Sequence, residues 1–282
     1  GGGGLWWGGG GGDGGGEGSG KRRPCRLPGI EEELLCGKLT FFENRQSRTG
    51  RTLDLNVVVL PALDSNKKEE PLFDLAGGPG AASTEGASFY AGEGKEYRRH
   101  RDVVLVDQRG TGESNGLKAA PRRKTPQDFL TEMYPVDYVK RLRQTLESRA
   151  DLTQYTTSIA MDDLDDVRAW LGYERINLFG LSYGTRAALV YLRQHPDRVR
   201  TVTLMGVVPP SLKMPLYHAQ AAARAMELLL QACEADAQCD EAFPRIRQDW
   251  RDVLARLDRE PARVQYAPPD KSPPVTVEIQ RD

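Results

Sequence analysis

The sequence lacks an excess of charge of either sign: its 282 residues include 39 Lys and Arg against 40 Asp and Glu. Without a basic excess to neutralise phosphates, the composition argues against a nucleic-acid-binding protein. With 39% hydrophobic residues and a net charge of only −1, it also argues against a disordered chain. No apolar run approaches the roughly 18 residues that a transmembrane helix needs, so no membrane span is expected. The chain is long enough for one large or two small globular domains.

A signal peptide is also not visible, because no charged segment followed by an apolar one occurs near the start. The sequence begins with Gly1, and its first methionine is Met133. Of the 30 glycines, 14 lie in the first 20 residues, where almost no side chain is available to bury. We therefore expect a disordered, glycine-rich head over residues 1–24, and a natural start other than Gly1.

Cysteine and histidine are scarce, with four and three residues. Four cysteines allow three pairings, and proximity along the chain favours Cys25 with Cys36 and Cys233 with Cys239. The spacing is not that of a zinc site, so no metal is expected. Two disulfides would indicate an oxidising compartment. The alternative is four unrelated thiols in a cytosolic protein.

Strand-like and helix-like segments alternate through much of the chain. Apolar and β-branched runs predict strands over residues 52–60, 71–76, 102–107, 175–179 and 200–205. Helices are expected around 125–149, 158–171 and 182–194. In the second of these, four aspartates between residues 162 and 166 lie off the apolar face, and Gly172 ends the helix. The alternation predicts a mostly parallel sheet with helices on both faces.

The alternation stops after residue 210. The next segments, 216–234 and 241–257, are typical of consecutive helices with no strand between them. The sequence then ends at Asp282 before the pattern of helices and strands is complete. We therefore expect a core over 25–210 and an incomplete helical cap over 211–282.

The strongest chemical signal is the G-x-S-x-G motif of residues 180–184, which lies between an expected strand and an expected helix. Such a sharp turn needs small flanking residues and lifts the serine hydroxyl clear of the sheet. It also directs the amides at the start of the helix towards developing negative charge. The motif therefore predicts Ser182 as a nucleophile, the alternative being an ordinary turn serine.

Two further motifs follow expected strands. Gly77-Gly78-Pro79-Gly80 allows the backbone to approach a carbonyl, so the N–H groups of Gly78 and Tyr183 are candidates for an oxyanion hole; the alternative is a tight turn. Residues 107–114 read DQRGTGES. For these we expect a structural role, in which Asp107 pairs with Arg109 and supports the loops beneath the serine.

Together these motifs resemble the α/β-hydrolase fold, and more narrowly the prolyl-aminopeptidase and tripeptidyl-aminopeptidase branch of serine peptidases. The resemblance runs from Cys25 to Cys239 and includes CGKLTFFENR, LAGGPG, VDQRGTGES, DLDDVRAWLG, GLSYGTRAA and HPDRV. It implies Ser182 as nucleophile, Gly78 and Tyr183 as oxyanion donors, and export with disulfides. It also implies removal of residues from a free peptide amino terminus. Ala76 stands where the prolyl-aminopeptidase loop has histidine, which favours the tripeptidyl-like members.

A catalytic base and acid are not evident. A serine hydrolase needs both, and in this fold they follow the serine in the order acid, then histidine. His195 falls at the far end of the helix that follows Ser182, ~18 Å away. His218 opens the helical insertion, and His100 lies upstream of the serine. We therefore expect the chain to be a fragment of a longer hydrolase, with the C-terminal part of the fold missing, and to be inactive by itself.

For the intact protein the sequence predicts acyl transfer to peptide substrates through an acyl-enzyme on Ser182, without any cofactor. The family resemblance and the cysteine pairs predict a secreted or periplasmic location. Glu227 and Glu234 in the cap are available to bind a peptide's free amine, and are equally suited to a solvated helix face. Sequence alone assigns neither a substrate-binding residue nor an oligomeric state. The alternatives are an esterase or lactone hydrolase of the same fold, and a non-catalytic binding domain on a hydrolase scaffold.

Overall fold

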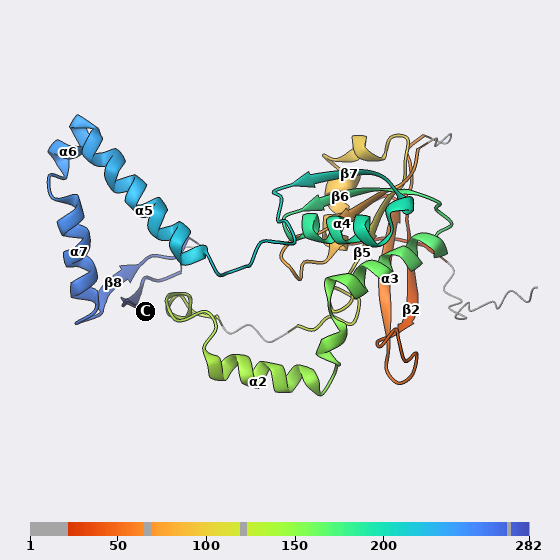
Figure 1. The fold of residues 1–282 in the computed structure, drawn as a ribbon, viewed down its shortest axis with the longest axis horizontal. Coiled ribbons are helices and arrows are strands. Elements are labelled where there is room, and N and C mark those ends of the chain that lie inside the picture. Colours follow the sequence, from red (N-terminus) through yellow and green to blue (C-terminus); the bar gives the residue numbers. More distant parts are fainter. Residues whose placement is uncertain (1–21, 65–68, 119–122, 270–271, 282) are drawn as a thin grey trace, which may run out of the picture. The chain divides into compact units, whose positions relative to one another are not determined.

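The structure is a computed structural model that describes residues 22–64, 69–118, 123–269 and 272–281. Most of the glycine-rich head expected over 1–24 lies outside the described residues. The chain forms two compact units (Figure 1). The first contains residues 1–116 and 153–208, and the second contains 117–152 and 209–282. The domain boundaries expected from the sequence stay predictions.

The first unit is built on a mixed sheet of seven strands. They are β1 (Arg23–Cys25), β2 (Leu34–Phe42), β3 (Thr52–Leu60), β4 (Leu72–Leu75), β5 (Val103–Val106), β6 (Ile176–Leu181) and β7 (Val199–Met205). The order is β1-β2-β3-β5-β4-β6-β7. Pairing is antiparallel from β1 to β5 and parallel from β5 to β7. The predicted α/β core is confirmed, and its parallel part is the part that carries the candidate site.

The sequence analysis assigned no strand to β1 or β2. The burial of β2 does not alternate regularly along its nine residues, so its apolar side chains show no clear two-residue period. The bounds expected from the sequence for the five later strands agree with the observed bounds to within two residues at either end. Four of those strands, β3 to β6, lie inside the sheet and are mostly buried, as is typical of strands covered on both faces, whereas β7 lies at its edge and only Val199 of it is buried.

Helices cover both faces of the sheet, as predicted. Successive side chains of a strand point to opposite faces, and on β3 Val57 and Val59 contact one core cluster while Val58 and Leu60 contact the other. The first cluster includes apolar residues of α3 (Thr157–Trp170) and α4 (Tyr183–Gln194). The second includes those of α1 (Ala87–Ala91). The interior strands β3 to β6 are therefore shielded from water on both faces, whereas most of the edge strand β7 is exposed or half-buried.

An arginine–carboxylate pair is buried between α3 and the loop that follows β5. Arg109 donates from Nε and Nη2 to the two carboxylate oxygens of Asp163, at 2.6 and 2.8 Å. Its Nη1 donates to the carbonyl oxygens of Glu43 and Gln154, both at 2.9 Å. The expected pairing of Arg109 with Asp107 is wrong, because α3 offers Arg109 a bidentate partner. The expectation that the aspartates of this helix all lie off the core is also wrong for Asp163, which is 1% exposed.

A second polar contact holds α1 against the opposite face. The hydroxyl of Tyr90 donates to Oδ2 of Asp74 on β4 at 3.0 Å. Burial raises the pKa of Asp74 to about 6, and the hydrogen bond from Tyr90 opposes that rise only in part. Burial thus disfavours the ionised form of this carboxyl group, and the neutral hydroxyl of Tyr90 compensates only part of that cost.

The second unit is mostly helical. Its elements are α2 (Val136–Glu147), α5 (His218–Ala235), α6 (Ala237–Ala242), α7 (Ile246–Leu257) and a hairpin of β8 (Ala262–Tyr266) and β9 (Val275–Ile279). The helix expected over 125–149 begins only at Val136. Proline has no N–H to donate and disfavours helical geometry in the residue before it, so the helix cannot extend across Pro135 towards residue 125. The helix expected over 241–257 is divided into the end of α6 and α7.

Two disulfides are present, and they are the pairs that proximity along the chain favoured. Cys25–Cys36 joins β1 to β2, and Cys233–Cys239 joins α5 to α6. Each closes a short loop within one unit, with sequence separations of 11 and 6 residues. Among the helices of the described ranges, none has the length and apolar character required to cross a membrane.

Replacing Arg109 with Lys is expected to lower the free energy of unfolding by about 3 kcal/mol, because Lys cannot reproduce the bidentate bond and leaves buried acceptors unpaired. Urea unfolding measures this loss. Arg99→Lys is the matched control, since Arg99 pairs with Glu96 at an exposed position, and should change stability by less than about 0.5 kcal/mol. Equal effects of the two substitutions would contradict the prediction.

Replacing Asp74 with Asn is expected to stabilise the protein at pH 8 and not at pH 4. The pKa of Asp74 is about 6 in the folded state, above its unfolded value, so its contribution to stability is complete below about pH 4 and is lost as the pH rises through 6. The amide removes this loss of about 3 kcal/mol. Urea unfolding at both pH values checks the sign, and an identical gain at pH 4 would show that ionisation is not the cause.

Candidate active site

Ser182 occupies a sharp turn between β6 and α4. Its φ of +54° and ψ of −119° lie outside the regions that residues other than glycine ordinarily adopt. Hydrogen bonds hold this conformation: Ser182 N–H donates to the carbonyl of Met205 at 2.9 Å, and the N–H and hydroxyl of Thr185 donate to the carbonyl of Ser182 at 2.9 and 2.6 Å. The Ser182 residue is exposed, so the turn presents its side chain to solvent.

Two glycines are required by close packing around this turn. A Cβ on Gly184 would overlap the carbonyl oxygen of Leu75 on β4. A Cβ on Gly180 would lie 2.6 Å from the carbonyl oxygen of Gly184, which is closer than real contacts allow. The expectation that the serine needs small flanking residues therefore has a specific cause: α4 begins directly against the end of β4.

The loop that follows β4 runs alongside Ser182. We call residues 76–82 the glycine loop. A Cβ on Gly77 would lie 3.2 Å from Cβ of Ser182 and 3.8 Å from its Oγ. Gly78 and Gly80 adopt φ of +107° and +110°, which favour glycine. β4 and β6 are parallel neighbours, with Leu75 opposite Gly180, so both strands end at the same edge of the sheet. The structure thus brings together the glycine loop and the serine turn that the sequence analysis selected.

Tyr183 is the first residue of α4, so its backbone N–H belongs to the unpaired N-terminal turn of that helix. Its hydroxyl is hydrogen-bonded to Oγ1 of Thr157 on α3 at 2.8 Å, which fixes the side chain on the helical layer. The positive end of the helix dipole favours an anion at this position. Tyr183 N–H is therefore suitably placed on the chain to stabilise charge that develops beside Ser182.

The described histidines of the first unit do not lie beside the serine. His195 contacts Asp162 at 3.0 Å, at the opposite end of the 12-residue α4 from Ser182. His100 pairs with Asp64 at 2.6 Å and precedes β5, whereas the serine follows β6, so these residues lie at opposite edges of parallel strands. His218 begins α5 in the second unit.

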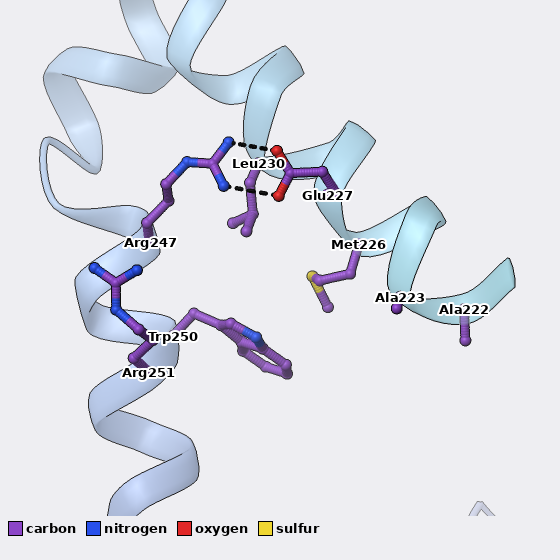
Figure 2. Close-up of a pocket in the computed structure, with 8 residues that line it drawn as sticks. All are labelled: Ala222, Ala223, Met226, Glu227, Leu230, Arg247, Trp250 and Arg251. Atoms are coloured by element: carbon purple, nitrogen blue, oxygen red, sulfur yellow. Dashed lines mark hydrogen bonds and ion pairs between the residues drawn. The ribbon is translucent and has the colours of Figure 1, made fainter. Parts of the chain in front are cut away.

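The two cap glutamates are already paired within the second unit. Arg247 on α7 donates to both oxygens of Glu227, at 2.8 and 3.0 Å, and to both oxygens of Glu234, at 2.6 and 2.9 Å. These bonds lower the pKa of both carboxyl groups. Figure 2 shows the Arg247–Glu227 pair at one end of a hollow of about 550 Å³, into which Met226 and Trp250 point. Both carboxylates are therefore paired with Arg247, and Glu234 is at the same time exposed to solvent.

Sequence reasoning missed three polar residues that support the turn and the loop. Thr185 is fully buried and, besides contacting Ser182, accepts a hydrogen bond from the N–H of Val208 at 2.7 Å. Ser83 and Thr84 hydrogen-bond to residues at the ends of β4 and β5. The available signal was their position: each is a hydroxyl residue within four residues of a motif glycine. Within the described ranges, no group of three or more metal-ligating side chains is arranged to hold an ion.

Comparison with known proteins agrees with this geometry. Residues 71–239 match the alpha/beta hydrolase fold family. The chain is 29% identical over 252 residues to a tripeptidyl aminopeptidase of Streptomyces lividans, covering 81% of this chain and 42% of that protein. It is 28% identical over 207 residues to the serine protease Hip1 of Mycobacterium tuberculosis, covering 67% and 39%. It is 29% identical over 142 residues to a proline iminopeptidase of Xylella fastidiosa, covering 50% and 34%.

The chain spans about two fifths of the length of the first two of these relatives. The family match includes β4, β5, β6 and β7, which form the parallel side of the sheet, together with the glycine loop, the Ser182 turn and α4. On the basis of this match and of the fold, the chain belongs to the alpha/beta hydrolase fold family.

Proposed function

We propose that this chain carries the nucleophile and oxyanion hole of an exported serine aminopeptidase, which releases single residues or tripeptides from peptide amino termini. The observation that carries the proposal is the strained Ser182 turn directly beside the glycine loop. A protein without catalysis has no need for a serine in this conformation. The peptidase relatives support a peptide substrate.

In the proposed reaction, Oγ of Ser182 attacks the carbonyl carbon of the scissile peptide bond. The electron pair of the carbonyl moves to its oxygen, and the N–H groups of Gly78 and Tyr183 stabilise the resulting anion. The C–N bond then breaks, and the amine leaves with the proton that came from Ser182. Water hydrolyses the acyl-enzyme, which releases the acid and restores the serine.

This reaction requires a base to accept the serine proton and an acid to orient that base. We propose that both come from sequence beyond residue 282, since neither His100 nor His195 is placed for the role and the relatives are much longer. The 282-residue chain alone is then inactive. The amine of the substrate would be bound elsewhere than by Glu227 and Glu234, because Arg247 already donates hydrogen bonds to both oxygens of each carboxylate.

The proposed location is secreted or periplasmic. Cys25–Cys36 and Cys233–Cys239 are both formed, and disulfides persist in oxidising compartments. In a reducing cytosol the chain would instead carry four thiols, and β1 and β2 would have no covalent link.

The product of the complete open reading frame is expected to cleave tripeptidyl or aminoacyl anilides, and Ser182→Ala is expected to lower kcat by about 10⁶-fold with little effect on folding, because the covalent route is lost. Ser88→Ala is the matched control, since Ser88 is an exposed serine on α1. Faster turnover of simple esters than of anilides would favour the esterase or lactone-hydrolase alternative. Unchanged peptide cleavage by the Ser182→Ala variant would exclude Ser182 as the nucleophile.

The 282-residue chain itself is expected not to react with a fluorophosphonate probe, because in this proposal the base that activates Ser182 is not among its residues. Intact-mass spectrometry measures labelling, with the complete protein as the positive control and the Ser182→Ala chain as background. Stoichiometric labelling of Ser182 in the 282-residue chain would show that a base is already present within it.

A further inference from the structure

We propose that Thr84 is a positioning residue for the oxyanion hole: by binding the buried Asp107, it holds the end of the glycine loop and so sets the position of the Gly78 N–H. The inference rests on the proposed function, because it concerns the site at which the reaction would take place. It assigns a role to residues that the proposed chemistry does not otherwise use.

Both ends of the glycine loop are anchored by side chains. At the first end, the hydroxyl of Ser83 donates to the carbonyl of Asp74 at 3.0 Å and accepts from the N–H of Ala76 at 3.3 Å. At the second end, the N–H of Thr84 donates to Oδ1 of Asp107 at 3.0 Å, and its hydroxyl lies 2.9 and 3.0 Å from the two carboxylate oxygens. The consecutive residues Ser83 and Thr84 therefore hold both ends of the loop: Ser83 joins its end to its beginning, and Thr84 joins its end to Asp107.

Asp107 is itself held rigidly at the end of β5. It is 0% exposed, and Oδ2 also accepts from Nδ2 of Asn56 and from the N–H of Glu113, both at 3.1 Å. No Lys or Arg forms an ion pair with it in the described part of the chain. A buried carboxylate without an ion-pair partner is stabilised by hydrogen bonds from neutral donors. Because loss of any of these bonds is costly, the N–H and O–H groups that donate to Asp107 are held in place.

A close contact between Gly112 and Ala82 also restricts the glycine loop. A Cβ on Gly112 would lie 2.7 Å from Cβ of Ala82, so the DQRGTGES loop lies directly against the last residue of the glycine loop. Between the two anchored ends, Gly78 and Gly80 have positive φ and offer little resistance to rotation of their own. The direction of the Gly78 N–H is consequently set by the anchors. A displacement of about 1 Å is enough to cost 10²-fold in rate.

Thr84→Val tests the anchor in the 282-residue chain, with no requirement for activity. Val keeps the shape of the side chain and removes the hydroxyl. Hydrogen–deuterium exchange of residues 77–82 should become about fivefold to tenfold faster, as expected for the loss of one hydrogen bond. Exchange in β4 and β6 should not change, and Thr84→Ser should restore slow exchange. Thr40→Val is the matched control, because it removes another Thr–Asp bond, to Asp54, at an exposed position.

The same variants in the complete protein test the consequence for catalysis. Thr84→Val should lower kcat by about 10- to 100-fold with KM changed less than about twofold, because oxyanion contacts strengthen only in the transition state. Thr84→Ser should recover most of this loss, and Thr40→Val should cause none.

Each failure has a distinct meaning. Normal kcat and normal loop exchange in Thr84→Val would overturn the positioning role while Ser182-dependent activity remained. Faster exchange throughout the first unit would also overturn it, because Thr84 would then be a general stabilising residue. If the complete protein has no Ser182-dependent activity, the proposed function fails, whereas the exchange result still decides whether Thr84 anchors the loop.

Discussion

The candidate site depends on one steric constraint, the close packing of the start of α4 against the end of β4. Gly184 leaves no room for a Cβ against the carbonyl of Leu75, so α4 can start where it does only with glycine at that position. This packing brings the strained serine and the glycine loop to the same edge of the sheet. It also places the first amides of α4 beside the serine hydroxyl. The cost of the unusual φ at Ser182 is offset by the hydrogen bonds from Thr185 and to Met205.

Two buried carboxylates support this edge in different ways. Asp163 is paired with Arg109 and also accepts from Arg45 at 2.8 Å, so positive charge compensates its burial and ties α3 to the loops. Asp107 instead collects neutral donors, among them Thr84. An ion pair resists separation of whole elements, whereas a set of N–H and O–H donors fixes the local course of the backbone. The packing of α3 and the shape of the glycine loop are thus governed by separate groups.

The second unit shows how tertiary contacts change the meaning of a sequence feature. Glu227 and Glu234 are seven residues apart, which places them on one face of α5, and by themselves they suggest an anionic surface for a substrate amine. Arg247 comes from α7 and bonds to both, and Figure 2 shows its two bonds to Glu227. The pair is therefore an internal clamp of the second unit. No sequence period on either helix indicates this contact, because it depends on how the two helices are brought together.

The strand over residues 52–60, the start of α4 at the Ser182 turn and the end of α3 at Gly172 follow from local sequence, because the spacing of apolar residues and the position of glycine act within a few residues. The order of the sequence motifs also indicates the family. Local sequence does not predict the strand order, the burial of Asp163, the partner of Arg109 or the contact between Thr84 and Asp107, which arise when the chain folds. Each of these joins segments that are distant in sequence, so its energy depends on which surfaces meet in the folded chain and not on local propensity.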